Sequence, residues 1–248
     1  MAVDQVGGGG TVQAGSGRWR LTQSVEQLLH VALYTRAVLG LPVTAGAPPP
    51  LRGAPDPLPA LLGADRVPAV AAWEQWWDDQ VALVGLMRGA DRPTPAAPAR
   101  AATPGGMGSP PPARGDRDRW AGWTHWRERV TYGPAGPPDY DGLDELLRPT
   151  AVSTWKAADT WTTRHVQGRP PDQTELGWAV AAEAAAAVAF DRDVPVGELH
   201  GLLLPLAVTG IWWAQWAPGI VLASFDAVTD PTAARAIAYT TLAGPHRT

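Results

Sequence analysis

The chain has 248 residues, 45 % of them hydrophobic, and a formal net charge of −4 at pH 7. The hydrophobic content is that of an ordinary globular protein, and the negative balance argues against a general nucleic-acid binder, which needs a concentrated positive field. Cysteine is absent, which excludes disulfides, thiolate metal sites and cysteine nucleophiles. Alanine, proline, glycine and arginine are abundant and Lys156 is the only lysine, which indicates a high-GC, bacterial-like coding bias.

Glycine and proline together exceed a fifth of the chain and are unevenly placed. Residues 1–17 are glycine-rich and lack a signal-peptide pattern, so a disordered leader and a cytoplasmic location are expected. Residues 90–115 combine recurrent prolines with no apolar periodicity, which predicts a linker or a long disordered loop. The ordered parts, 18–89 and 116–244, can pack as one domain because each predicted helix has a face that it cannot bury alone.

Two helices are predicted in the first ordered part. The first spans about 22–39, where Ser24 and Gln27 have the spacing of a capping box. The second spans about 68–88, with an apolar stripe at helical spacing. That stripe consists of Val70, Trp73, Trp77, Val81 and Val84. The two helices are expected to pair as an antiparallel hairpin.

Further helices are predicted in the second ordered part from apolar residues at helical spacing. They span about 116–130, 140–147, 151–165, 172–190 and 231–242. The helix over 172–190 is alanine-rich, so another element can approach it closely. The last helix has Asp230 as its expected N-cap and Pro231 in the first turn, where a missing N–H costs little.

The run 199–225 carries no charged side chain and has the length of a membrane-spanning helix. The dipeptides Thr209-Gly210 and Pro218-Gly219 are turn signals, however, and divide the run into pieces of strand length. A buried antiparallel β-meander is therefore favoured, with a membrane segment and a broken core helix as alternatives. Both faces of this meander carry tryptophan, so helices should cover both, and Pro205 indicates an edge strand or a bulge.

The 13 tryptophans depart most from an average composition. Trp120, Trp123 and Trp126 fall on one side of the helix predicted over 116–130, with Arg127 beside them. Core packing explains such a face, and so does a surface that binds another protein, since tryptophan and arginine are enriched at binding hot spots. Stacking on sugars or bases, or lying in a membrane interface, is less favoured because the chain is acidic.

Few residues suggest catalytic chemistry. Glu74 and Asp78 lie one helical turn apart, the spacing of paired carboxylates that share a proton or a metal, although a solvated acidic face is the ordinary explanation. His200, at the entrance to the uncharged run, is the histidine most worth testing. No two-histidine zinc motif, phosphate-binding loop or serine elbow is present, so no metal and no cofactor are expected.

These patterns predict a mostly α-helical α+β fold, with a helical hairpin and a helical region that holds a small antiparallel β-meander near the C-terminus. The function expected is that of a non-enzymatic interaction or assembly protein. Its partner would be another protein or a second copy, bound through the surface of Trp120, Trp123, Trp126 and Arg127, and no nucleic acid is expected. The alternatives are an enzyme that uses Glu74, Asp78 and His200, and a membrane-attached protein that uses 199–225.

Overall fold

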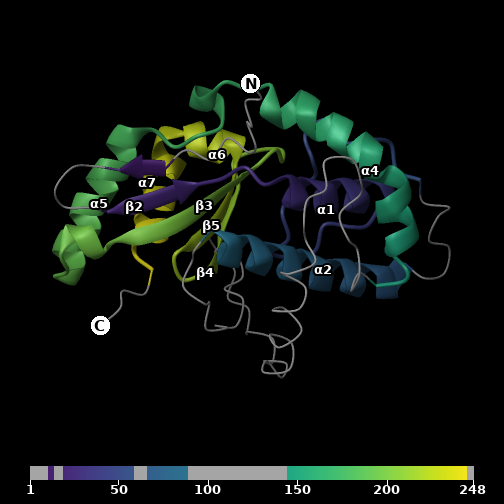
Figure 1. The fold of residues 1–248 in the computed structure, drawn as a ribbon, viewed down its shortest axis with the longest axis horizontal. Helices are drawn as coiled ribbons and strands as arrows, with labels where there is room; N and C mark the ends of the chain where they lie inside the picture. The colour runs from purple at the N-terminus through teal and green to yellow at the C-terminus, as the bar shows by residue number, and fades with distance from the viewer. Residues whose placement is uncertain (1–10, 14–18, 59–65, 89–143, 245–248) are drawn as a thin grey trace, which may run out of the picture.

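The computed structural model describes residues 11–13, 19–58, 66–88 and 144–244, and shows a mostly helical α+β fold around one mixed sheet (Figure 1). The strands are β1 (Thr11–Gln13), β2 (Arg20–Gln23), β3 (His200–Leu206), β4 (Trp213–Ala217) and β5 (Ile220–Ser224). The α-helices are α1 (Gln27–Val38), α2 (Arg66–Met87), α4 (Arg148–Thr162), α5 (Trp178–Arg192), α6 (Phe225–Thr229) and α7 (Pro231–Leu242). A π-helical turn, η3 (Thr163–Gln167), and two 3₁₀ turns, η4 (Pro171–Gln173) and η5 (Val196–Glu198), complete the described elements. The linker predicted over 90–115 and the helix predicted over 116–130 lie outside the described residues.

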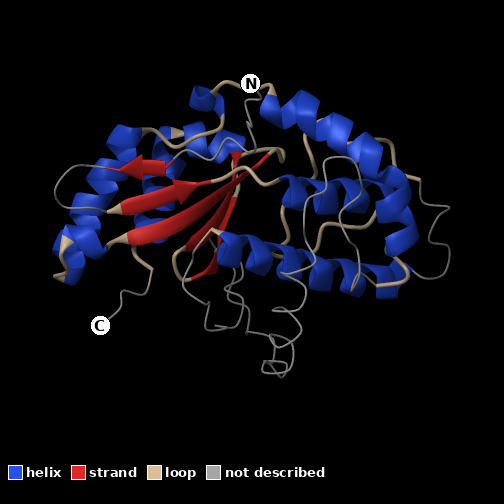
Figure 2. Ribbon diagram, viewed as in Figure 1, coloured by secondary structure: helices blue, strands red, loops and turns tan. Residues whose placement is uncertain are grey.

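The strands lie in the order β1-β2-β3-β5-β4 in a single sheet (Figure 2). β2, β3 and β5 run parallel to one another, whereas β1 and β4 run antiparallel to their neighbours. The carboxyl ends of β3 and β5 therefore meet at one edge of the sheet. In folds with an open, mainly parallel sheet covered by helices, ligands usually bind just beyond the carboxyl ends of the strands.

Apolar side chains alternate between the two faces of β3 and β5, and both faces are buried. One face packs against α1, α2 and α4, and the other packs against α5 and α7, which lie on opposite sides of the sheet in Figure 1. The first face carries Leu202, Leu204, Leu206, Ile220 and Leu222, and the second carries Leu203, Val221 and Ala223. Trp212 and Trp216 pack on the first face and Trp213 on the second. The prediction that helices cover both faces is confirmed.

The uncharged run 199–225 forms β3, β4, β5 and the first residue of α6, so its interpretation as one membrane-spanning helix is wrong. Pro218-Gly219 joins β4 to β5 as an antiparallel hairpin, with Gly219 at a φ of +75°. The prediction that all three strands are antiparallel neighbours in chain order is wrong. After β3 the chain forms β4 on the far side of β5, and β5 then lies between them, parallel to β3. In the ranges that the structure describes, no helix is both long enough and apolar enough to span a membrane.

Pro205 lies in a central strand, not in the edge strand or bulge that its sequence position predicts. It is in register with Ala223 of β5, while the pairing of β3 with β2 ends at Gln23 and Leu203. The Leu203 carbonyl accepts a hydrogen bond from Ser24 N–H on the β2 side, at 3.1 Å. Because backbone groups alternate in direction along a strand, the nitrogen of Pro205 also faces that side, beyond the end of β2. The missing N–H therefore costs no ladder hydrogen bond.

The N-terminal helix begins later than predicted. Residues 20–23 form β2, in which Leu21 and Gln23 are buried and Arg20 is exposed, a two-residue period that fits a strand. α1 starts at Gln27, and its N-cap has no side-chain hydrogen bond, so the predicted capping box is wrong.

The strand β1 lies within the range 1–17, for which a disordered leader is predicted. Its three residues pair antiparallel with β2, and the pairing runs from Thr11 opposite Thr22 to Gln13 opposite Arg20. The other residues of 1–17 lie outside those that the structure describes.

α1 and α2 form the predicted antiparallel hairpin. At one end, Arg88 Nε donates to Glu26 Oε1 at 2.6 Å, and at the other Arg66 donates to the carbonyl oxygen of Gly40. Between these ends the indole of Trp73 donates to the carbonyl oxygen of Ala32 at 2.8 Å. The predicted stripe of α2 faces this hairpin and the sheet, and four of its five members are buried. Those four are Trp73, Trp77, Val81 and Val84.

Three of the helices predicted in the second part, over 151–165, 172–190 and 231–242, are present, and the first two start elsewhere than predicted. α4 and η3 together cover 148–167, close to the predicted 151–165. In the predicted helix 140–147, the described residues 145–147 form a turn. α5 begins at Trp178 and not at 172, because η4 and an irregular stretch precede it. Alanines of α5 share a core with α7, which confirms the expected close approach.

Replacing Asp230 by alanine is expected to lower the free energy of unfolding by about 1 kcal/mol, as for other lost N-caps. Asp230 Oδ1 accepts hydrogen bonds from the N–H groups of Thr232 and Ala233, at 3.1 and 2.8 Å, which confirms the predicted cap of α7. Urea-induced unfolding measures the effect. Asp230→Asn is the matched control because its amide oxygen can still accept these bonds, and an equal loss in both variants would contradict the capping explanation.

Candidate functional site

The partner-binding residues predicted from the sequence are not among those that the structure describes. Trp120, Trp123, Trp126 and Arg127 all lie in the range 89–143, outside the described part of the chain. The predicted Trp/Arg surface therefore stays a prediction.

The predicted catalytic residues lie on two elements. Glu74 and Asp78 lie on α2, and each carboxylate accepts a hydrogen bond from a neutral side chain. Thr44 Oγ1 donates to Glu74 Oε1 at 2.6 Å, and Trp216 Nε1 donates to Asp78 Oδ1 at 3.2 Å. His200 begins β3, where its Nδ1 lies 3.0 Å from a main-chain carbonyl oxygen. Within the described ranges, no three histidine or acidic side chains are grouped to hold a metal ion.

A different set of side chains meets at the carboxyl ends of β3 and β5. It draws on the loop before α2, on the end of α4, on η3 and Arg169 two residues beyond it, and on the first turn of α6. We call this set the carboxyl-end cluster. It consists of Arg52, Trp161, His165, Arg169, Phe225 and Asp226.

Hydrogen bonds to the main chain fix the loop that carries Arg52. Leu51 forms an isolated bridge with Val208, just beyond β3. The N–H of Arg52 donates to the carbonyl oxygen of Ala207 at 2.9 Å. The indole of Trp161 donates to the carbonyl oxygen of Gly53 at 2.9 Å. The loop is thereby held between the end of β3 and α4.

His165 is oriented by a hydrogen bond and a stacked ring. Its Nδ1 lies 3.0 Å from the carbonyl oxygen of Trp161, so Nδ1 carries the proton and Nε2 is the acceptor in the neutral ring. The imidazole stacks on the Trp161 indole with centroids 4.8 Å apart and planes at 15°. Nε2 faces Gly53, where a Cβ would lie only 3.1 Å from it. His165 also lies in the π-helical turn η3, a feature that often marks functional sites.

The two arginines of the cluster have different partners. Arg52 forms an ion pair with Asp226, and its Nε is buried without a hydrogen-bond partner. Arg169 donates through Nε to the carbonyl oxygen of His165 at 2.8 Å, and its guanidinium lies 5.6 Å from the centre of the Phe225 ring. Within the described residues Arg169 forms no ion pair with a carboxylate. The cluster therefore holds two permanent positive charges and one negative charge.

A buried histidine lies beneath the cluster. The ring of His30 lies 6.1 Å from that of Trp161 and 6.5 Å from that of Phe225. Its Nδ1 bonds to the carbonyl oxygen of Glu26 at 2.8 Å, and its Nε2 accepts the N–H of Ala207 at 3.1 Å. Burial lowers the pKa of His30 to about 4, so the ring is neutral at pH 7. His30 therefore stabilises the end of β3 and adds no charge to the cluster.

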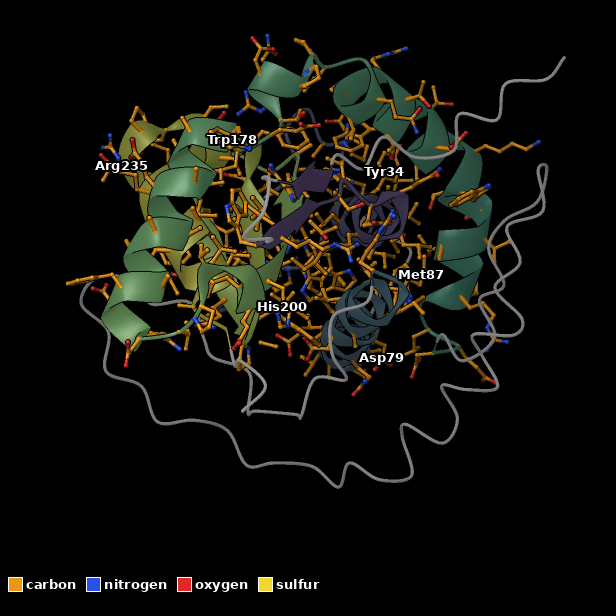
Figure 3. The ribbon with its side chains drawn as sticks, turned by 60° about the vertical axis from the view of Figure 1, so that its left-hand side comes forward. Tyr34, Asp79, Met87, Trp178, His200 and Arg235 are labelled. Atoms are coloured by element: carbon orange, nitrogen blue, oxygen red, sulfur yellow. The ribbon has the colours of Figure 1, made fainter. Side chains whose placement is uncertain are left out.

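A second surface feature lies on α5, the helix that covers the opposite face of the sheet. Phe190 is 87 % exposed and Trp178 is 53 % exposed. Between them the outward residues are small apart from Glu183, whose carboxylate lies 4.0 Å from Arg235 Nε of α7. We call this surface the α5 outer face; it consists of Trp178, Ala179, Glu183, Ala186, Ala187 and Phe190. Figure 3 shows Trp178 and Arg235 on this side of the molecule, away from Tyr34, Asp79 and Met87.

Sequence reasoning missed both features for different reasons. The carboxyl-end cluster joins segments more than 100 residues apart, as in the contact of Trp161 with Gly53, and no motif links them. The α5 outer face could have been found from the sequence, because Trp178 and Phe190 are the large apolar residues on a side of α5 that otherwise carries alanines and Glu183. Comparisons with protein-family models, with curated proteins and with solved structures found no match to this chain.

Proposed function

We propose that the protein is a non-enzymatic interaction or assembly protein and that it associates with a second copy of itself through the α5 outer face. The observation that carries this proposal is the exposure of Phe190 and Trp178 on one helix, with alanines between them. Large aromatic side chains that stay exposed beside small ones offer apolar area for a partner to bury.

The composition of the α5 outer face favours a second copy over an unrelated partner. In a two-fold symmetric dimer the same patch meets itself, so the patch must be complementary to its own charges. The α5 outer face carries one acid, Glu183, and has one base, Arg235, beside it. Glu183 of one copy can then meet Arg235 of the other without like-charge repulsion.

The small side chains also permit close contact between two copies of α5. Trp178 and Phe190 are twelve residues apart, or about 18 Å along the helix axis. When the two-fold axis is perpendicular to α5, the two α5 helices run antiparallel, and Trp178 of each copy can then reach Phe190 of the other across Ala179 and Ala186. The exposed aromatic rings would then be covered in pairs.

Replacing Phe190 by serine is expected to weaken self-association by about tenfold or more, the equivalent of losing 1.4 kcal/mol of contact free energy. Sedimentation velocity of the full chain over a wide concentration range measures this. Ile211→Ser is the matched control, because Ile211 is also a large exposed apolar residue, at 63 %, but lies outside α5. A wild-type chain that stays monomeric at every concentration, or equal effects of both substitutions, would overturn the proposal.

The surface predicted at Trp120, Trp123, Trp126 and Arg127 is a second docking surface under the same proposal. If this face is exposed, iodide should quench part of the tryptophan fluorescence, and Trp123→Ala should lose part of the quenchable signal. An unchanged quenchable fraction would assign these tryptophans to a core. The cytoplasmic location and the enzyme alternative based on Glu74, Asp78 and His200 stay predictions.

A further inference from the structure

We infer that the carboxyl-end cluster binds a small oxyanion, the carboxylate or phosphate group of a small molecule. This inference is independent of self-association, because the cluster lies at the carboxyl ends of β3 and β5 and shares no residue with the α5 outer face. It rests on a closed ring of contacts, on the charge inside that ring, and on the unused donors of one arginine.

The contacts return to their starting point. Arg52 pairs with Asp226, whose chain neighbour Phe225 lies under the guanidinium of Arg169. Arg169 in turn donates to the carbonyl oxygen of His165, at 2.8 Å. The imidazole of His165 faces Gly53, the chain neighbour of Arg52. Two cationic side chains and one imidazole are thus brought to the same place by segments that are far apart in the sequence.

The fixed charges around this ring favour an anion. Arg52 and Arg169 outnumber the single carboxylate of Asp226, and His30 below is neutral at pH 7. The guanidinium group presents planar, forked N–H donors that match the geometry of carboxylate and phosphate oxygens. The carboxyl-end cluster therefore has one positive charge more than its carboxylate can balance, and a small oxyanion can neutralise that charge.

Arg169 is the residue best prepared to contact the ligand. Its Nε donates to the His165 carbonyl oxygen, and its guanidinium carbon lies 5.6 Å from the centre of the Phe225 ring, so two contacts restrict the position of the guanidinium. The terminal nitrogens form no ion pair within the described residues. They remain available as donors, and little side-chain entropy is lost when they bind.

The ion pair between Arg52 and Asp226 sets the strength of binding. While Asp226 holds Arg52, the carboxylate competes with any anion for that guanidinium and repels the ligand. Removing the negative charge but keeping the shape, as in Asp226→Asn, is therefore expected to strengthen anion binding. Removing Arg169 is expected to weaken it. A purely structural role for these residues gives no reason for opposite effects.

Isothermal titration calorimetry of the full chain with inorganic phosphate, and separately with acetate, tests the inference at constant ionic strength. Arg169→Gln is expected to weaken binding by about tenfold or more, the scale of a hydrogen bond to a charged group, and Asp226→Asn to strengthen it severalfold. Arg164→Gln is the matched control, because Arg164 is exposed on the same π-helical turn but has no contact in the cluster. It should leave binding unchanged.

The outcomes separate the two ligand chemistries. Binding of phosphate without acetate identifies a phosphate-bearing ligand, and the reverse identifies a carboxylate. If neither anion binds the wild type or Asp226→Asn, the inference is wrong. It is equally wrong if Arg164→Gln weakens binding as much as Arg169→Gln, since the effect would then reflect net charge alone. Thermal unfolding of each variant without anion shows that it is folded.

Discussion

Acidification from pH 7 to pH 4 is expected to lower the free energy of unfolding by about 3 kcal/mol through His30 alone. The pKa of His30 is about 4 in the folded chain and 6.5 when the ring is solvated. Between these values the unfolded chain binds a proton that the folded chain does not. The contribution of neutral His30 to the free energy of unfolding is therefore fully present above pH 6.5 and is lost as the pH falls toward 4.

Burial explains why the folded chain resists this protonation, because a charged imidazole ring would lose its hydration there. The Nδ1–H of His30 is used by the Glu26 carbonyl oxygen, and the lone pair of Nε2 accepts the N–H of Ala207. A proton on Nε2 would remove that acceptor and leave a buried positive charge beside an N–H donor. The backbone just after β3 would lose its partner at the same time, because β2 has already ended at Gln23.

Urea-induced unfolding between pH 7 and pH 4 measures this effect as the difference between the wild type and His30→Gln. The variant should show a shallower fall in stability, because glutamine has no proton to gain. If His30→Gln does not fold, nitrogen NMR of the wild-type imidazole replaces it, and a His30 that titrates near pH 6.5 would contradict the prediction.

The elements that the sequence predicts well are those with local signals. The stripe of α2 and the cap of α7 are each contained in one segment, and both appear as expected. β2 has only four residues, and its two-residue period is too short to be told from the start of the helix predicted over 22–39. Its pairing with β3 joins Arg20 to His200, a contact between distant segments that no local pattern specifies.

The candidate site was even less predictable. The sequence has five histidines, and His165 is the one that ends a predicted helix. The Trp161 indole on which it stacks and the glycine that it faces are neighbours only in the folded chain. Arg52 lies in a proline-rich stretch and Asp226 follows a strand, 174 residues later. A parallel pair of strands brings them together, and that pairing was predicted as antiparallel. The error in topology therefore hid the edge of the sheet where the cluster lies.

Replacing Gly201 by alanine is expected to lower the free energy of unfolding by about 3 kcal/mol, the upper part of the range for overpacked cores. Gly201 lies in β3, where the C-terminal end of α7 crosses the strand. A Cβ at this position would overlap the carbonyl oxygen of Thr241 and would lie 2.7 Å from its Cγ2 and 2.9 Å from its carbonyl carbon.

The cost is high because the obstructing atoms cannot move independently. Two of the three belong to the backbone of α7, and Thr241 is itself buried with its hydroxyl donating to the carbonyl oxygen of Ile237 at 2.7 Å. Relief requires α7 to shift away from the sheet, and α7 shares its core with α5 and β5. The strain would therefore spread through the whole layer that covers this face, and would not be absorbed by one rotamer.

Gly177→Ala is the matched control for this prediction. Gly177 precedes α5 at a φ of −62°, and a Cβ there meets no atom within 4 Å, so only a few tenths of a kcal/mol are expected from the changed N-cap. Thermal and urea unfolding of both variants give the comparison. Equal stability of Gly201→Ala and the wild type would mean that α7 does not press on β3 as described, and the layer of α5 and α7 over the sheet would then have to be placed differently.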